Sequence, residues 1–150
     1  MRLFGLILLV LVLLPATETL GQEPQEDKEK IQGTWKIVSF KQIGGKDMAP
    51  AEALKTVKVV IAADKIVFDF GKGAVDEFSY KLDSSKEPKA IDLVEKKGKP
   101  SLPGVYSLDG DDLKLCWDPN AKARPIEFST EGKATEKDVR LLVLKREKKK

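Results

Sequence analysis

The sequence predicts an all-β protein, an antiparallel up-and-down barrel of eight strands that begins with a short N-terminal helical turn. Strand-like segments recur at intervals of roughly 8–16 residues, and most alternate apolar with polar side chains. No internal segment of ordinary helix length carries an apolar stripe of period 3.6. Short connections favour pairing between neighbouring strands, and closure of the sheet removes its edges.

Residues 1–21 are predicted to be a secretory signal peptide. Arg2 supplies a positive charge, and residues 3–14 contain no polar side chain. As a helix this run spans about 18 Å, whereas a bilayer core is roughly 30 Å thick. Small residues at Thr19 and Gly21 predict cleavage before Gln22, and an uncleaved membrane anchor is the alternative. We therefore expect an exported protein, periplasmic or extracellular, without a lipid anchor, because the only cysteine is Cys116.

One domain follows the signal peptide, because about 129 remaining residues suit a single core. Residues 22–30 are a polar leader able to form one or two helical turns, residues 31–146 are the barrel, and residues 147–150 are a basic tail. The tail is interpreted as a solvated terminus, with contact to an anionic surface as the alternative.

The predicted strands are short and rich in β-branched or aromatic residues. In order, they are Thr34–Lys41, Thr56–Ala62, Lys65–Phe70, Glu77–Leu82, Ala90–Glu95, Gly104–Leu108, Leu113–Trp117 and Val139–Lys145, with a shorter candidate at Pro125–Ser129. Asp64 marks one hairpin turn, and residues 109–112, an Asp-Gly-Asp-Asp sequence, mark another. Residues 51–56 are expected to form one helical turn.

Composition argues against an enzyme or a metal site. The chain has no histidine, which removes the usual general base and the commonest transition-metal ligand. The aspartates of residues 109–112 lack the spacing of a calcium loop, so a β-turn explains them. The net charge of +3 is spread over a nearly balanced surface, which does not indicate a nucleic-acid partner. We expect a monomer with no cofactor and no metal.

Gly33-Thr34-Trp35 at the start of the first strand resembles the first signature of lipocalins. The resemblance implies that Trp35 closes the narrow end of a lipocalin-like barrel under a basic residue from the last strand, for which Arg140 and Arg146 are the candidates, followed by Lys145. Further segments are residues 31–39, 64–65, 81–83, 88–93, 104–108, 110–116, 124–128 and 144–146. In this order and spacing the chain is similar to an exported, lipocalin-like domain family of planctomycete bacteria with no assigned activity.

Two function classes stay open. The first is a non-enzymatic binding module that holds a small apolar or amphipathic ligand, with Tyr80, Tyr106, Trp117 and Arg124 as candidates for the wall and rim. The second is a solid barrel that contacts another protein or the cell envelope. Cys116 is expected to be a semi-buried strand residue, and Asp92 to satisfy backbone amides or to bind a ligand from the barrel interior.

Overall fold

The computed structural model describes residues 23–95, 98–131 and 138–148. The expected signal peptide, Gln22 and the last two residues of the basic tail lie outside the described residues. Within the described part of the chain, no helix is long and apolar enough to span a membrane.

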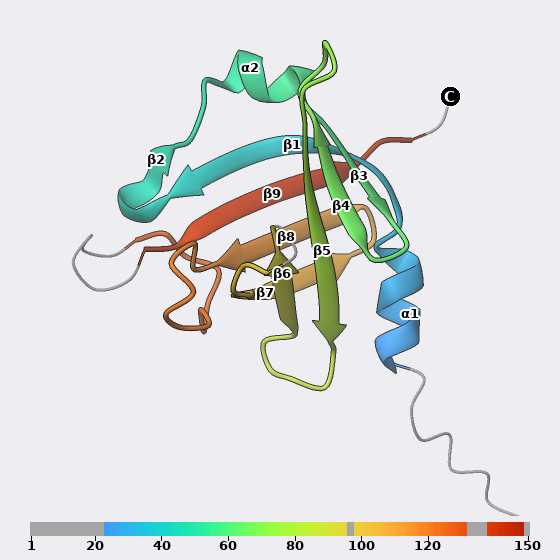
Figure 1. Cartoon of the computed structure of the whole chain (residues 1–150), viewed down its shortest axis with the longest axis vertical. Coiled ribbons are helices and arrows are strands. Elements are labelled where there is room, and N and C mark those ends of the chain that lie inside the picture. The colour runs from blue at the N-terminus through green and yellow to red at the C-terminus, as the bar shows by residue number, and fades with distance from the viewer. Residues whose placement is uncertain (1–22, 96–97, 132–137, 149–150) are drawn as a thin grey trace, which may run out of the picture.

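The described strands form one antiparallel sheet that closes into a barrel (Figure 1). Closure occurs because β1 (Gly33–Gln42) pairs with both β3 (Lys58–Ala62) and β9 (Arg140–Arg146). Between them lie β4 (Lys65–Asp69), β5 (Val75–Asp83), β6 (Ala90–Val94), β7 (Leu102–Asp109) and β8 (Asp112–Trp117), each paired with its neighbours in the chain. The predicted up-and-down barrel of eight strands is confirmed, and a two-residue strand, β2 (Lys46–Asp47), adds to the end of β1.

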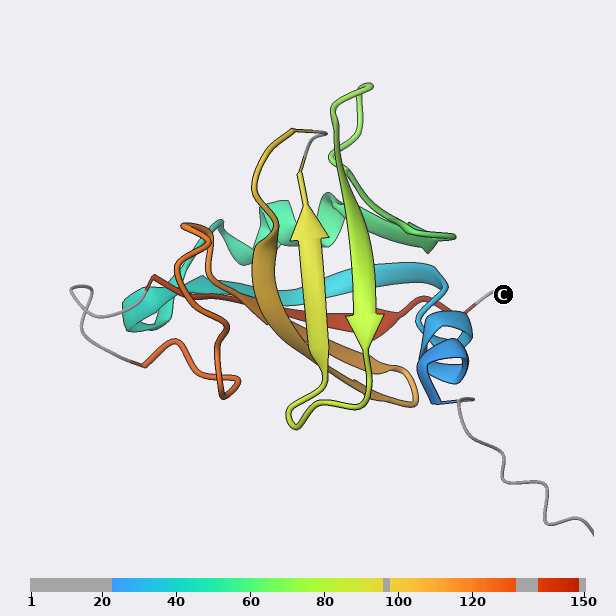
Figure 2. The same cartoon turned by 60° about the horizontal axis from the view of Figure 1, so that its bottom comes forward.

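The described residues form two α-helices, which flank the barrel, and a short 3-10 helix, η1 (Ile43–Gly45), between β1 and β2. The leader forms α1 (Glu23–Lys30), which lies against the end of the barrel where β1 begins (Figures 1 and 2). The expected turn at residues 51–56 is α2 (Ala51–Thr56), and it directs Leu54 into the core. We call the end beside α1 the closed end. The opposite end, which holds the β4–β5 and β8–β9 connections, is the open end.

Side chains alternate between the two faces of each strand, so every second residue points into the barrel. The largest side chains that are fully buried are Trp35, Tyr106, Ile31, Ile61, Ile66, Ile91, Leu113, Leu115, Leu142 and Leu144. Most of these residues lie toward the closed end or in the middle of the barrel. The core therefore fills the barrel from the closed end upward.

A β-bulge interrupts the alternation of β1. The register with β9 shifts between Ile37 and Ser39, which leaves Val38 exposed. Because the bulge adds one residue, the inward face changes from odd to even positions, so Trp35 and Ile37 belong to the core and Phe40 packs against it. The sequence predicted an uninterrupted strand here.

The strand expected at Pro125–Ser129 is absent, and this prediction was wrong. Both edges of β8 are already occupied by β7 and β9, so no neighbouring edge is available to this segment. The chain after β8 instead forms an irregular segment, residues 118–131, on the outer surface. Its fold depends on the Asp118 carboxylate, which accepts hydrogen bonds from the backbone N–H groups of residues 120, 122 and 123 at 2.7–3.1 Å.

Candidate functional site

An aromatic cavity of about 140 Å³ lies at the open end of the barrel. Its lining comprises Phe40, Ile66, Phe68, Phe70, Asp76, Phe78, Leu93, Leu115, Trp117 and Arg140. The rings of Phe40 and Trp117 stack with centroids 5.8 Å apart, and those of Phe68 and Phe78 meet edge to face at the same separation. These ring contacts fix the walls of the cavity before any ligand enters.

Trp117 reaches the cavity because the residue opposite it has no side chain. Gly104 of β7 pairs with Trp117 of β8, and a Cβ atom added to Gly104 would lie 3.0 Å from the Trp117 Cβ. It would also lie 2.7 Å from the carbonyl oxygen of Cys116, closer than real Cβ contacts allow. The close approach of β7 and β8 at this pair therefore depends on glycine.

Two charged side chains from opposite regions of the sheet line this apolar cavity. Arg140 is the first residue of β9, and Asp76 is the second residue of β5. Neither side chain forms an ion pair or hydrogen bond with any residue that the structure describes. Both charges are therefore available to a polar group on a molecule that enters the cavity.

Trp35 lies at the closed end, and its cationic neighbour is Arg146. The guanidinium carbon of Arg146 is 4.2 Å from the centroid of the Trp35 ring, a cation–π distance. The same guanidinium donates hydrogen bonds to the backbone carbonyls of Lys30 and Gln32. Arg140, the other candidate for this role, is at the opposite end of β9 in the aromatic cavity, so only Arg146 covers Trp35.

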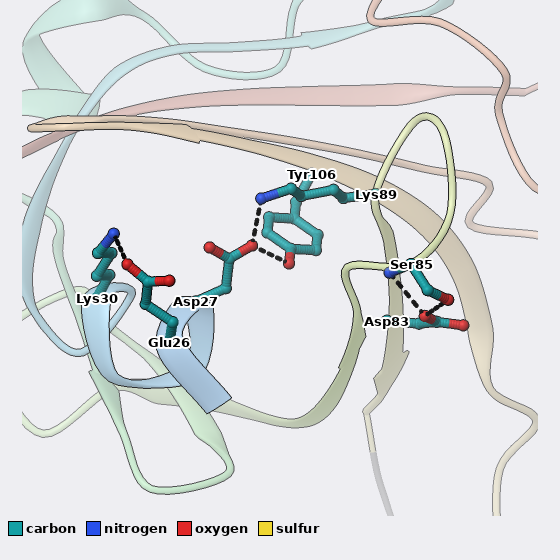
Figure 3. A network of polar contacts seen from close by, with 7 residues as sticks. All are labelled: Glu26, Asp27, Lys30, Asp83, Ser85, Lys89 and Tyr106. Carbon is teal, nitrogen blue, oxygen red and sulfur yellow. Dashed lines mark hydrogen bonds and ion pairs between the residues drawn. The ribbon is translucent and has the colours of Figure 1, made fainter. Parts of the chain in front are cut away.

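Tyr106, expected on the ligand wall, is instead part of a polar cluster at the closed end (Figure 3). Its hydroxyl donates to the Asp27 carboxylate of α1 at 2.6 Å, and Lys89 contacts the same oxygen at 2.7 Å. Burial would raise the pKa of Asp27, but the hydrogen bonds and positive charges around it lower the pKa below its usual value. Burial and Asp27 raise the pKa of Tyr106. The cluster fastens α1 to the barrel.

Figure 3 also shows Asp83, whose carboxylate has contacts within a turn. Asp83 at the end of β5 accepts hydrogen bonds from the hydroxyl and backbone N–H of Ser85. These bonds lower the pKa of Asp83. The geometry accounts for Asp83 as the start of the β5–β6 connection.

Tyr80, the other tyrosine expected on the wall, also lies away from the aromatic cavity. Its hydroxyl donates to the carbonyl oxygen of Ala63 at 3.0 Å and accepts from the Gln32 side chain at 2.9 Å. Burial raises the pKa of Tyr80. This hydroxyl joins the α1–β1 connection to the β3–β4 turn.

Arg124, expected at the rim, fastens residues 118–131 to the outer surface. Its guanidinium donates to the carbonyl oxygens of Ile91 and Gly104 at 3.1 and 2.6 Å, and it pairs with the Asp92 carboxylate at 2.7 Å. Asp92 therefore lies on the outer face, and the expectation that it faces the barrel interior was wrong. Arg124 has its contacts within the protein and is not among the residues that line the cavity.

Cys116 faces outward on β8 but is fully buried. It lies in a row with Ala90 of β6 and Val105 of β7, which are also buried on the outer face. The backbone of Ser129, in the segment 118–131, hydrogen-bonds to the thiol, and burial raises the pKa of Cys116 to about 11. A buried thiol with a raised pKa is a poor nucleophile, which agrees with a structural role.

Among the described residues, no cluster of three or more His, Cys, Asp or Glu is placed to hold a metal ion. Of the four residues expected to bind a ligand, only Trp117 lines the aromatic cavity. Four phenylalanines that were not among the expected ligand-binding residues form most of its wall, namely Phe40, Phe68, Phe70 and Phe78. A usable signal was the clustering of phenylalanines at strand ends that meet at the open end.

Comparison of the chain with protein-family models, with curated proteins and with solved structures finds no match in any of the three. The resemblance to planctomycete lipocalin-like domains therefore stays a prediction from the sequence.

Proposed function

We propose that this protein is an exported binding module without catalytic activity, which holds a small amphipathic ligand in the aromatic cavity. The observation that carries the proposal is the pairing of an aromatic lining with an arginine, Arg140, that has no partner among the described residues. The apolar run at residues 3–14 supports export, and the lack of histidine supports a role without acid–base chemistry.

The size of the cavity limits the ligand. A dry engineered cavity of roughly 150 Å³ accommodates benzene, and the cavity here is about 140 Å³. The barrel below it is filled by its own side chains, so a long acyl chain has no room within the barrel. We infer that the bound group is one ring or a short branched chain, inserted among Phe68, Phe78 and Trp117.

The charge at the cavity selects the polar end of the ligand. A guanidinium in an apolar setting binds carboxylates through strong charge-assisted hydrogen bonds. Asp76, on the same lining, disfavours a second negative charge nearby. The preferred ligand is therefore an apolar ring with a single acidic group directed at Arg140.

Fluorine NMR titrations with two probes of equal ring size test this proposal. We expect 4-fluorobenzoate to bind more tightly than neutral fluorobenzene, and Arg140→Gln to remove that preference. Arg146→Gln is the matched control, because it removes an arginine from the same face of the same strand at the closed end. Absence of saturable binding by either probe would refute the proposed site.

A pair of adjacent substitutions on β6 tests the location. Leu93 lines the cavity and the next residue, Val94, faces outward. Leu93→Phe should fill the cavity and abolish binding of both probes, whereas Val94→Phe should leave binding unchanged. Equal binding by the two variants would place the probe elsewhere on the protein.

A further inference from the structure

Trp117 and Arg140 are direct cross-strand partners at the open end of the barrel. Trp117 is the last residue of β8 and Arg140 is the first residue of β9, and the register of the two strands pairs them. Both side chains line the aromatic cavity. Residues that lie opposite each other on one face of an antiparallel pair have Cβ atoms about 4.5–5.5 Å apart. The indole and the guanidinium are therefore neighbours on the wall of the cavity.

The indole N–H of Trp117 has no hydrogen-bond acceptor in the part of the chain that the structure describes, although the residue is only 6% exposed. The other indole, that of Trp35, donates to the Ile31 carbonyl at 3.0 Å. Buried donors are normally paired, because an unpaired donor loses its hydrogen bonds to water without a replacement. The Trp117 nitrogen is not sealed within the described protein, since the fully enclosed side-chain atom without a partner there is the Ser84 hydroxyl oxygen. Alternation along β8 turns Trp117 inward, so its open surface belongs to the cavity.

Two unpaired donors therefore lie side by side on this wall. The Arg140 guanidinium also forms no ion pair or hydrogen bond with any described residue. Asp76, the acidic residue of the lining, comes from β5, which is not a neighbour of β8 or β9 in the sheet. The rest of the lining is aromatic or aliphatic and offers no side-chain acceptor. The acceptor for both donors thus has to come from a molecule that enters the cavity.

We propose that Trp117 and Arg140 together hold the carboxylate of the ligand, with one oxygen accepting from the indole N–H and the other from the guanidinium. This inference rests on the proposed function, and it adds Trp117 as a residue that positions and selects the ligand. A carboxylate carries two acceptor oxygens, which suits two adjacent donors. The stack on Phe40 fixes the indole ring before binding. A ligand whose polar end has a single acceptor oxygen leaves one donor unpaired and binds more weakly.

Proton–nitrogen NMR of the two indole groups tests this hydrogen bond without any substitution. Addition of 4-fluorobenzoate should move the Trp117 indole proton downfield and slow its exchange with solvent, because the N–H gains a charged acceptor. Trp35 is the internal control, since its N–H is already paired with Ile31 and its signal should stay in place. Saturating fluorobenzene supplies the ring without the carboxylate and should not produce the downfield shift. Equal responses of Trp117 to both probes would overturn the proposal.

The preference for 4-fluorobenzoate over fluorobenzene separates the hydrogen bond from the contact with the wall. Trp117→Phe keeps an aromatic ring and removes the N–H, so this preference should fall roughly tenfold, as expected for one hydrogen bond to a charged group. Phe78→Leu is the matched control, because it removes an aromatic side chain from the same lining without removing a donor. It should weaken both probes alike and leave the preference unchanged. A folded Trp117→Phe variant with the full preference would contradict the proposed role of Trp117.

The outcomes distinguish this inference from the proposed function. If 4-fluorobenzoate binds with a preference that depends on Arg140, but the Trp117 indole signal does not respond, the ligand site stands and the role of Trp117 is refuted. If neither probe binds, both proposals fail. Circular dichroism verifies the fold of each variant, and the NMR measurement on the parent protein decides the matter where a variant does not fold.

Discussion

The guanidinium of Arg146 covers the indole ring of Trp35 at 4.2 Å, although β9 and β1 are the last and first strands of the barrel. The contact lies where the two ends of the sheet meet. Arg146 also holds the carbonyl oxygen of Gln32 at 2.7 Å, so one side chain joins the closing strand to the turn after α1. The contact therefore belongs to the closure of the barrel and is separate from the aromatic cavity.

We expect Arg146→Ala to lower the free energy of unfolding by about 2 kcal/mol, from the lost cation–π contact and charge-assisted hydrogen bonds. Urea denaturation followed by tryptophan fluorescence measures the loss. Arg140→Ala is the control and should cost less than about 0.5 kcal/mol, because its side chain has no such contacts among the described residues. Equal losses would contradict the closing role of Arg146.

Asp27 should make the protein less stable in acid. Its pKa is lowered in the folded state, so its ionised form stabilises the fold above the unfolded pKa of about 3.9. That contribution is lost as the pH falls through the lower folded pKa. Urea midpoints measured between neutral pH and strongly acidic pH should therefore decline below about pH 4.

The Asp27→Asn variant isolates this effect from other carboxylates, such as Asp83, whose pKa is also lowered. The variant should be about 2 kcal/mol less stable at neutral pH, and its decline in acid should be shallower than that of the parent protein. Tyr106→Phe should also lower the free energy of unfolding, because it removes the hydrogen bond from Tyr106 to Asp27. In the double variant the two losses should not be additive. If the stability of both proteins falls equally as the pH is lowered, Asp27 is not a source of the acid sensitivity.

The thiol of Cys116 should resist modification in the folded protein. With a pKa of about 11 and no exposed surface, it should react with a disulfide reagent at least about a hundredfold more slowly than free cysteine. Asp118→Ala removes the carboxylate that organises residues 118–131 and should accelerate the reaction. Rapid labelling of the native parent protein would contradict this packing.

Gly104→Ala should destabilise the protein by about 2–3 kcal/mol, because the added methyl group meets the Cys116 carbonyl and the Trp117 side chain. Thermal unfolding measures the effect. Ser107→Ala, on the outward face of the same strand, is the control and should change stability by less than about 0.5 kcal/mol. If Gly104→Ala lowers the stability only slightly, β7 and β8 can move apart at this pair without destabilising the protein.

Local patterns were enough to predict most of the strands. Alternation placed β3, β4 and the second half of β5 correctly, and the Asp-Gly turn at Gly110 joined β7 to β8 as expected. The bulge at Val38 was not predictable, because it depends on register between strands. Register is set by pairing between strands across the whole sheet, and a short segment of sequence does not show which distant residues it will pair with.

The choice between Arg140 and Arg146 could have been made from topology alone. In an up-and-down barrel of eight strands, the last strand runs antiparallel to the first, so its C-terminal end meets the N-terminal end of the first. Trp35 is near the start of β1, which selects Arg146. The aromatic cavity was harder to predict, because inward-facing phenylalanines look alike whether they fill a core or line a gap.

Pairing of β1 with β9 also constrains the order of events during folding. Lys36 pairs with Lys145, so the ring of strands cannot close until nearly all of the chain is available. Contacts of such long sequence separation carry a high entropy cost and slow the folding of β proteins. Without β9, one edge of β1 and one edge of β8 would be left unpaired. Barrel closure therefore has to wait for β9, because without this strand the sheet stays open between β8 and β1.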